Sequence, residues 1–273
     1  VLNLVFGTPD EISSNLIARD AVRLVAFTGS TAVGKHLTRL AADSVTPVLM
    51  ELGGHAPVVV CEDTDVRAAA VSGAVRKMRN AGQVCTSPTR FFVHEDIFDE
   101  YVDHFVERAA ATVVGSGFAE GVEMGPLANA RRPTALASLV EDAVERGATL
   151  RSGGAALPGP GYFFAPTVLT DVPEDARVMQ EEPFGPLAVI NRVKNLDEAI
   201  ARANGVPYGL AAYGFTNRAD YADRLLEELE AGNVSINTLE ASLPETPFGG
   251  VKASGFGREG GSEGLHNYMV VKN

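Results

Sequence analysis

The sequence predicts an α/β protein built on an open, mostly parallel sheet with helices on its faces. Short apolar runs rich in β-branched residues alternate with amphipathic segments of helical period along the chain. Strands that alternate with helices of about 10–15 residues form βαβ units, and such units give parallel sheets. The composition, 45% hydrophobic and 21% charged, is that of a folded protein.

These patterns place the elements in chain order. The apolar runs predict strands at 2–6, 24–28, 48–52, 57–60, 90–93, 149–152, 188–192, 211–215 and 233–237. The amphipathic segments predict helices at 11–19, 32–42, 66–80, 97–111, 130–146, 196–203 and 219–230. Gly147 directly follows one of these helices, as a C-terminal capping glycine does.

Composition argues against several functions. Lys and Arg total 23 and Asp and Glu 35, and a net charge of −12 does not favour nucleic-acid or anionic-membrane binding. Apolar runs such as 58–61 are too short to cross a bilayer. Cys61 and Cys85 cannot build a disulfide framework, so we expect a reducing, cytoplasmic setting. The five histidines show no metal-ligand spacing, and no metal site is expected.

Two segments follow apolar strands directly. In 27–35 (FTGSTAVGK) a strand ends at Gly29 and a helix begins after Ser30, a pattern suited to a phosphate group, although an ordinary helix cap has the same pattern. In 51–57 (ELGGHAP) Glu51 ends a strand at the sheet edge where α/β proteins bind ligands. Apolar walls would raise its pKa toward that of a general base, and the alternative is a carboxylate bonded to turn amides.

Two further segments are loops. In 80–85 (NAGQVC) a glycine-containing turn carries Cys85, and accessibility is the first condition for a thiolate nucleophile. A buried, inert cysteine is the alternative there, and is how we interpret Cys61 at a strand end. In 181–186 (EEPFGP) two prolines stiffen a turn in which Glu182 could bond sugar hydroxyls and Phe184 could support a flat ring. A stiffened surface loop is the alternative.

Together these segments resemble the aldehyde dehydrogenase superfamily. Glu51 and Cys85 stand at the separation typical of that family, and further matches follow at 207–210 (PYGL), 232–237 (GNVSIN) and 247–252 (PFGGVK). The resemblance implies NAD- or NADP-dependent oxidation of a small-molecule aldehyde to a carboxylic acid. Cys85 would attack the carbonyl, and Glu51 would activate the water that hydrolyses the resulting thioester.

The resemblance also implies binding residues. Gly29 and Ser30 would lie near the cofactor pyrophosphate, Glu182 would bond the nicotinamide ribose, and Phe184 and Leu52 would lie beside the nicotinamide ring.

Arg79 and Ser242 match positions that bind the substrate carboxylate in succinate-semialdehyde dehydrogenases, and an arginine fork suits a carboxylate. The alternatives are a surface arginine, on a basic helix end with Arg76 and Lys77, and a plain loop serine.

Family members carry a longer N-terminal portion, so the resemblance divides this chain into three parts. Residues 1–53 would be the last part of a nucleotide-binding domain, 54–250 the catalytic domain, and 251–273 a return segment with a strand that joins neighbouring subunits in a dimer or tetramer. A fragment of this kind is expected to have little activity alone. The alternatives are a non-catalytic scaffold, an aldehyde dehydrogenase of different specificity, or an enzyme that passes the acyl group to coenzyme A, which Glu51 disfavours.

Overall fold

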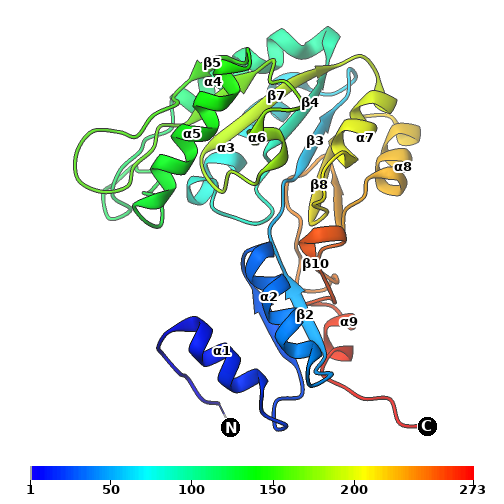
Figure 1. The fold of residues 1–273 in the computed structure, drawn as a ribbon. Coiled ribbons are helices and arrows are strands. Elements are labelled where there is room, and N and C mark those ends of the chain that lie inside the picture. The colour runs from blue at the N-terminus through cyan, green and yellow to red at the C-terminus, as the bar shows by residue number, and fades with distance from the viewer. Residues whose placement is uncertain (1) are drawn as a thin grey trace.

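The computed structural model describes residues 2–273, and its strands form two separate sheets (Figure 1). The smaller sheet contains β1 (Val25–Thr28), β2 (Val48–Glu51) and β10 (Gly255–Phe256), in the order β1-β2-β10. β1 pairs with β2 in parallel, and β10 pairs with β2 in the antiparallel direction. The end of the chain therefore returns to the strand that carries Glu51.

The larger sheet is the mostly parallel sheet that the sequence predicts. Its order is β5-β6-β7-β4-β3-β8-β9, and only β5 and β6 pair antiparallel. Its strands are β3 (Pro57–Val60), β4 (Arg90–His94), β5 (Thr149–Ser152), β6 (Thr167–Thr170), β7 (Leu187–Val193), β8 (Ala211–Phe215) and β9 (Asn233–Ile236). Central strands such as β3 are buried throughout, which explains their continuous apolar sequence.

Helices flank this sheet, with α4 and α5 at the left of Figure 1 and α7 and α8 at the right. The α-helices are α1 (Pro9–Ile17), α2 (Thr31–Ala42), α3 (Val66–Met78), α4 (Phe98–Ala110), α5 (Arg131–Glu145), α6 (Arg177–Gln180), α7 (Leu196–Asn204), α8 (Ala219–Glu228) and α9 (Glu263–His266). Three 3₁₀ turns are η1 (Arg79–Gly82), η2 (Glu95–Ile97) and η3 (Lys252–Ser254). Residues 2–273 contain no helix long and apolar enough to cross a membrane.

The chain passes from one sheet to the other at residues 52–56, between β2 and β3. Leu52 N donates to the Ser254 carbonyl at 3.0 Å, and Ser254 Oγ donates to the Gly53 carbonyl at 2.7 Å. These bonds tie the return segment to the crossing point. The domain boundary at residue 53, which the family resemblance implies, stays a prediction.

Several expected elements differ. The strand predicted at 2–6 is wrong, because this segment is exposed (Leu2 96%) and pairs with no described strand. The helix predicted over 66–80 ends at Met78, since Asn80 takes a φ of 52°. Strands β6 and β10 were not predicted. The tail at 267–273 forms no strand within this chain.

Candidate active site

Glu51 is a buried carboxylate without a partner. It ends β2 with 4% exposure, and neither oxygen has a hydrogen-bond partner among residues 2–273. Burial raises its pKa from 4.5 to about 7, and the negative charge of Glu259 adds to the rise while Arg258 opposes it. The alternative of a carboxylate bonded to turn amides is therefore wrong for this conformation.

The glycine pair after β2 packs against the backbone of Cys85. A Cβ atom on Gly54 would lie 2.4 Å from the Cys85 carbonyl oxygen, a distance that only glycine allows. A Cβ atom on Gly53 would lie 2.6 Å from Glu182 Oε2, and Gly54 N donates to Glu182 Oε1 at 3.0 Å. The turn thus brings three motifs, which lie far apart in the sequence, into contact.

Cys85 lies in a turn, residues 84–87, which we call the Cys85 turn. It is half-buried, and Ser87 N closes the turn on the Val84 carbonyl at 2.9 Å. Burial raises the pKa of the Cys85 thiol, and the negative charges of Glu182 and Glu51 raise it further, while the backbone N–H groups of residues 85 and 86 lower it. The charges of both carboxylates therefore act on the Cys85 thiol.

Cys61 has a different environment. It is buried at 4% exposure, and burial raises the pKa of its thiol to about 12. Its role as a strand-end hydrophobic residue is consistent with this position.

The loop at 181–186 is held by contacts with Gly82 and with Arg132. A Cβ atom on Gly82 would lie 2.0 Å from the Gly185 carbonyl, and Gly82 takes a φ of +68°. Arg132 donates to the carbonyls of Pro183 and Phe184. Burial raises the pKa of Glu182 to about 7, opposed by the Gly54 N–H, Lys77 and Arg132. This loop is part of the site and is not a free surface loop, and the Phe184 side chain is left 36% exposed.

The segment 29–34 forms an ordinary helix cap. Ser30 is the N-cap of α2, and its Oγ accepts from Val33 N at 3.4 Å. Leu52 packs below this helix, because a Cβ atom on Gly34 would lie 2.4 Å from Leu52 Cδ2. This cap does not decide between an ordinary helix N-terminus and a phosphate-binding one.

An apolar cavity of about 700 Å³ lies between α1, β1 and α2, and sequence reasoning missed it. Its walls include Ile12, Leu16, Val33 and Leu37. Helical periodicity predicts the two helices, but it does not predict how far apart they lie in the fold.

Arg79 and Ser242 are in different surroundings. Arg79 is exposed and lines a cavity of about 710 Å³ that also contains Arg76 and Arg108. Arg76 pairs with Glu240 at 2.9 Å, whereas Arg79 makes no hydrogen bond or ion pair within the described chain. Ser242 is exposed and does not line this cavity. The structure therefore does not place the two residues in one pocket.

Three buried polar residues support the site and were not predicted. Arg90 donates to the His55 carbonyl at 2.9 and 3.0 Å and to carbonyls at the end of α7, so it fixes the residue after the glycine pair. Tyr213 donates to the Thr86 carbonyl at 2.7 Å. Lys77 is fully buried, so its assignment to a basic surface at the helix end is wrong.

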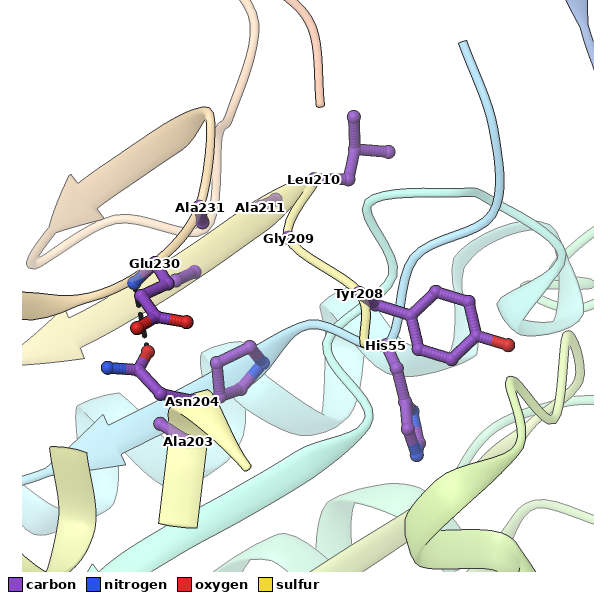
Figure 2. Close-up of a pocket in the computed structure, with 11 residues that line it drawn as sticks. His55, Ala203, Asn204, Tyr208, Gly209, Leu210, Ala211, Glu230 and Ala231 are labelled. Atoms are coloured by element: carbon purple, nitrogen blue, oxygen red, sulfur yellow. Dashed lines mark hydrogen bonds between the residues drawn. The ribbon is translucent and has the colours of Figure 1, made fainter. Parts of the chain in front are cut away.

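A small cavity lies on the other side of His55, with about 10 Å³ of space, enough for about one water molecule (Figure 2). His55 and Tyr208 meet edge-on there, 6.1 Å apart. At the rim of this cavity the Glu230 N–H donates to Asn204 Oδ1 at 2.9 Å. Its walls include neither Glu51 nor Cys85. No group of three metal-ligating side chains occurs in the part of the chain that the structure describes.

Comparison with known proteins identifies the family. Residues 1–273 match the aldehyde dehydrogenase family. The 4-(hydroxymethyl)benzenesulfonate dehydrogenase of Comamonas testosteroni is 48% identical over 272 residues, which cover 100% of this chain and 56% of that protein. The chain thus spans about half the length of the curated relatives it matches.

Two solved structures are similar along nearly the whole chain. The succinate-semialdehyde dehydrogenase of Burkholderia pseudomallei is 41% identical with a TM-score of 0.96, covering 98% of this chain and 56% of that one. The betaine aldehyde dehydrogenase of Staphylococcus aureus, solved with NAD⁺, is 34% identical with a TM-score of 0.93, covering 97% of this chain and 54% of that one. The resemblance found in the sequence is confirmed, and the chain belongs to the aldehyde dehydrogenase family.

Proposed function

We propose that the protein oxidises an aldehyde to a carboxylic acid, with Cys85 as the nucleophile and Glu51 as the general base. The observation that carries this proposal is the close approach of Gly54, the second glycine after Leu52, to the backbone of Cys85. It joins a buried, unpaired carboxylate to the turn that carries a half-buried thiol. A scaffold has no use for that combination, because an unpaired buried carboxylate costs stability.

The reaction divides between the two residues. As the thiolate, the Cys85 sulfur forms a bond to the aldehyde carbon, and the carbonyl electrons move to the oxygen. When that carbon gives up a hydride, the electrons return from the oxygen and the C=O bond of an acyl group on Cys85 forms. NAD or NADP, when bound, supplies the hydride acceptor. Glu51 later takes a proton from the water that attacks the acyl group on Cys85, and the C–S bond breaks with the thiolate as leaving group. With its pKa near 7, Glu51 is matched to this task at neutral pH.

The chain offers suitable positions for a dinucleotide. Only one of the first N–H groups of α2 is bonded to the Ser30 side chain, so others remain for a phosphate beside Gly29. The apolar cavity between α1 and α2 suits a flat ring. Glu182 keeps Oε2 against the backbone of Gly53, where it could accept from a ribose hydroxyl, and Phe184 is exposed beside it.

The substrate is proposed to carry an acidic group, as in succinate semialdehyde. Arg79 has no ion pair within residues 2–273, whereas the two other arginines of its cavity pair with Glu240 and Glu123. An unpaired guanidinium of this kind binds oxyanions bidentately. The Burkholderia pseudomallei structure is named for succinate semialdehyde and the Comamonas testosteroni relative for a benzenesulfonate, so both names contain an anion. A sulfonated aldehyde is therefore the second candidate.

Substrate comparison on the whole protein tests this assignment. Succinate semialdehyde should be oxidised with a lower KM than butanal, and Arg79→Ala should raise its KM by about tenfold or more, because a charge-assisted hydrogen bond is lost. The KM for butanal should not change. Equal KM values for both aldehydes in the parent protein would refute the acidic substrate and leave the oxidation itself standing.

Replacement of each cysteine tests the reaction. Cys85→Ser should abolish aldehyde oxidation, and iodoacetamide should modify Cys85 and leave buried Cys61 unmodified. The matched variant Cys61→Ser should keep the activity. Oxidation that survives in Cys85→Ser would overturn the proposal in favour of the scaffold or of another nucleophile.

We also propose a homo-oligomer. Tyr268, Met269, Val270 and Val271 are 60–96% exposed and adjacent in the sequence. An exposed apolar run of this kind is typical of a contact with another chain. Sedimentation of the protein with all four residues changed to serine should give a smaller species than the parent protein.

A further inference from the structure

Lys77 is the one lysine of the five that is not exposed, and its side chain is fully buried. It lies in the last turn of α3, on the face formed by Ala70, Gly73 and Ala74, which are also buried. Taking an ammonium group out of water is costly unless it finds partners. A buried lysine at this position must therefore be stabilised by specific partners.

Its hydrogen bond leads to the Cys85 turn. Lys77 Nζ lies 3.2 Å from Ser87 Oγ, and this is its only hydrogen bond within residues 2–273. Ser87 in turn closes the turn with its backbone N–H on the Val84 carbonyl, and its own carbonyl accepts from Thr89 Oγ1 at 3.0 Å. Lys77 thus holds the side chain of the residue that shapes the turn.

A second fixing point shows why this bond matters for the thiol. Tyr213 Oη donates to the Thr86 carbonyl at 2.7 Å from the side of β8. Thr86 and Ser87 are therefore held from two elements, α3 and β8, directly after Cys85. The Gly54 backbone packs on the Cys85 carbonyl as a third fixed surface. The turn has little freedom while all three are present.

The charge of Lys77 also reaches the site. Burial lowers the pKa of Lys77 to about 7, and Glu182 opposes that fall. Conversely, Lys77 lowers the pKa of Glu182. The charge of Lys77 thus partly offsets a carboxylate that disfavours the Cys85 thiolate.

We propose that Lys77 is a positioning residue for the nucleophile: through Ser87 it fixes the Cys85 turn so that the sulfur is held against the substrate carbonyl. This inference rests on the proposed role of Cys85. Displacements of about an ångström at a reacting atom can cost around a hundredfold in rate, so a loosened turn should be measurable.

The test compares Lys77→Met, Ser87→Ala and the double variant in the whole protein. Each single variant should lower kcat for aldehyde oxidation, and the rate of Cys85 alkylation by iodoacetamide, by about tenfold, with KM within about twofold of the parent value. Because both changes remove one bond, the double variant should be no slower than Lys77→Met alone. The matched control is Arg67→Met, which removes an exposed cation from the same helix and should keep the parental rates.

The other outcomes are distinct. Multiplying effects in the double variant, parental rates in both single variants, or an equal loss in Arg67→Met would each overturn the positioning role. If Lys77→Met does not fold, Ser87→Ala decides, because it deletes the same bond with a smaller change. Failure of the proposed function would show differently, as oxidation by the parent protein that persists after Cys85→Ser.

Discussion

Replacement of Glu51 by glutamine should slow catalysis and stabilise the fold at the same time. The carboxylate is buried without a hydrogen bond to any residue of the described chain, and its pKa is raised from 4.5 to about 7. Glutamine keeps the shape of the side chain and removes its charge. The two effects have one cause, since the group that must ionise to act as a base is held where ionisation is unfavourable.

The size of the stability effect follows from the two pKa values. Between pH 4.5 and about 7 the folded chain keeps a proton that the unfolded chain releases, so this contribution to stability is full below pH 4.5 and is lost as the pH rises to 7. At 1.36 kcal/mol per pH unit, the ionised side chain costs up to about 3 kcal/mol at pH 8. Glutamine escapes this cost, so Glu51→Gln should be more stable than the parent protein at pH 8 and equally stable near pH 4.

Urea unfolding at both pH values measures the stability effect, and pre-steady-state kinetics measure the catalytic one. Loss of the base should lower the steady-state rate by about 10²–10⁴ and leave a rapid burst of one reduced cofactor per Cys85. In the parent protein, hydrolysis should rise with pH up to about 7 and then level off. A variant that is no more stable than the parent at pH 8, or that keeps full turnover, would refute the reasoning.

Three further variants test the contacts of the site. Gly54→Ala places a Cβ atom 2.4 Å from the Cys85 carbonyl oxygen, so it should lower the free energy of unfolding in urea by about 1–3 kcal/mol and reduce the activity. An unchanged free energy of unfolding would contradict the contact. Glu182→Gln should weaken NAD or NADP binding by about tenfold in calorimetry, and unaltered affinity would remove Glu182 from the cofactor site. Arg90→Met removes two donors from the His55 carbonyl and should lower the free energy of unfolding by about 3 kcal/mol. An unchanged free energy of unfolding would mean that water replaces the guanidinium, and would contradict this role of Arg90.

The larger sheet and most of its helices could be predicted, because their signals are local. A continuous apolar run such as Val58–Val60 is typical of a strand buried inside a parallel sheet. Strand β10 has no such signal. It is two residues long, and it exists because Phe256 pairs with Met50, far away in the sequence. The segment 2–6 has a strand-like sequence but forms no strand, because no described strand lies beside it to pair with.

Sequence alone could nominate candidate site residues where the residue type itself carries the proposed chemistry, as for Glu51 and Cys85. It could not nominate the residues that support them, because the role of such a residue depends on a partner elsewhere in the fold. The alternative of a surface arginine at position 79 grouped Lys77 with Arg76 on a basic helix end. Helical periodicity alone places Lys77 three, four and seven residues after Ala74, Gly73 and Ala70, on the buried face, and that pattern would have found it.

The charges of the site explain why two carboxylates and a thiol can share it. Glu51 and Glu182 each disfavour a thiolate at Cys85, and burial disfavours the ionisation of all three. The three groups therefore titrate as a set, and the protonation of one eases the ionisation of another. In the proposed reaction a neutral Glu51 would favour the thiolate that attacks the aldehyde, and acylation would remove the charge of the sulfur, so that Glu51 could then ionise and accept a proton from water. The environment that disfavours the ionisation of each group alone thus fits the order in which the proposed reaction would use them.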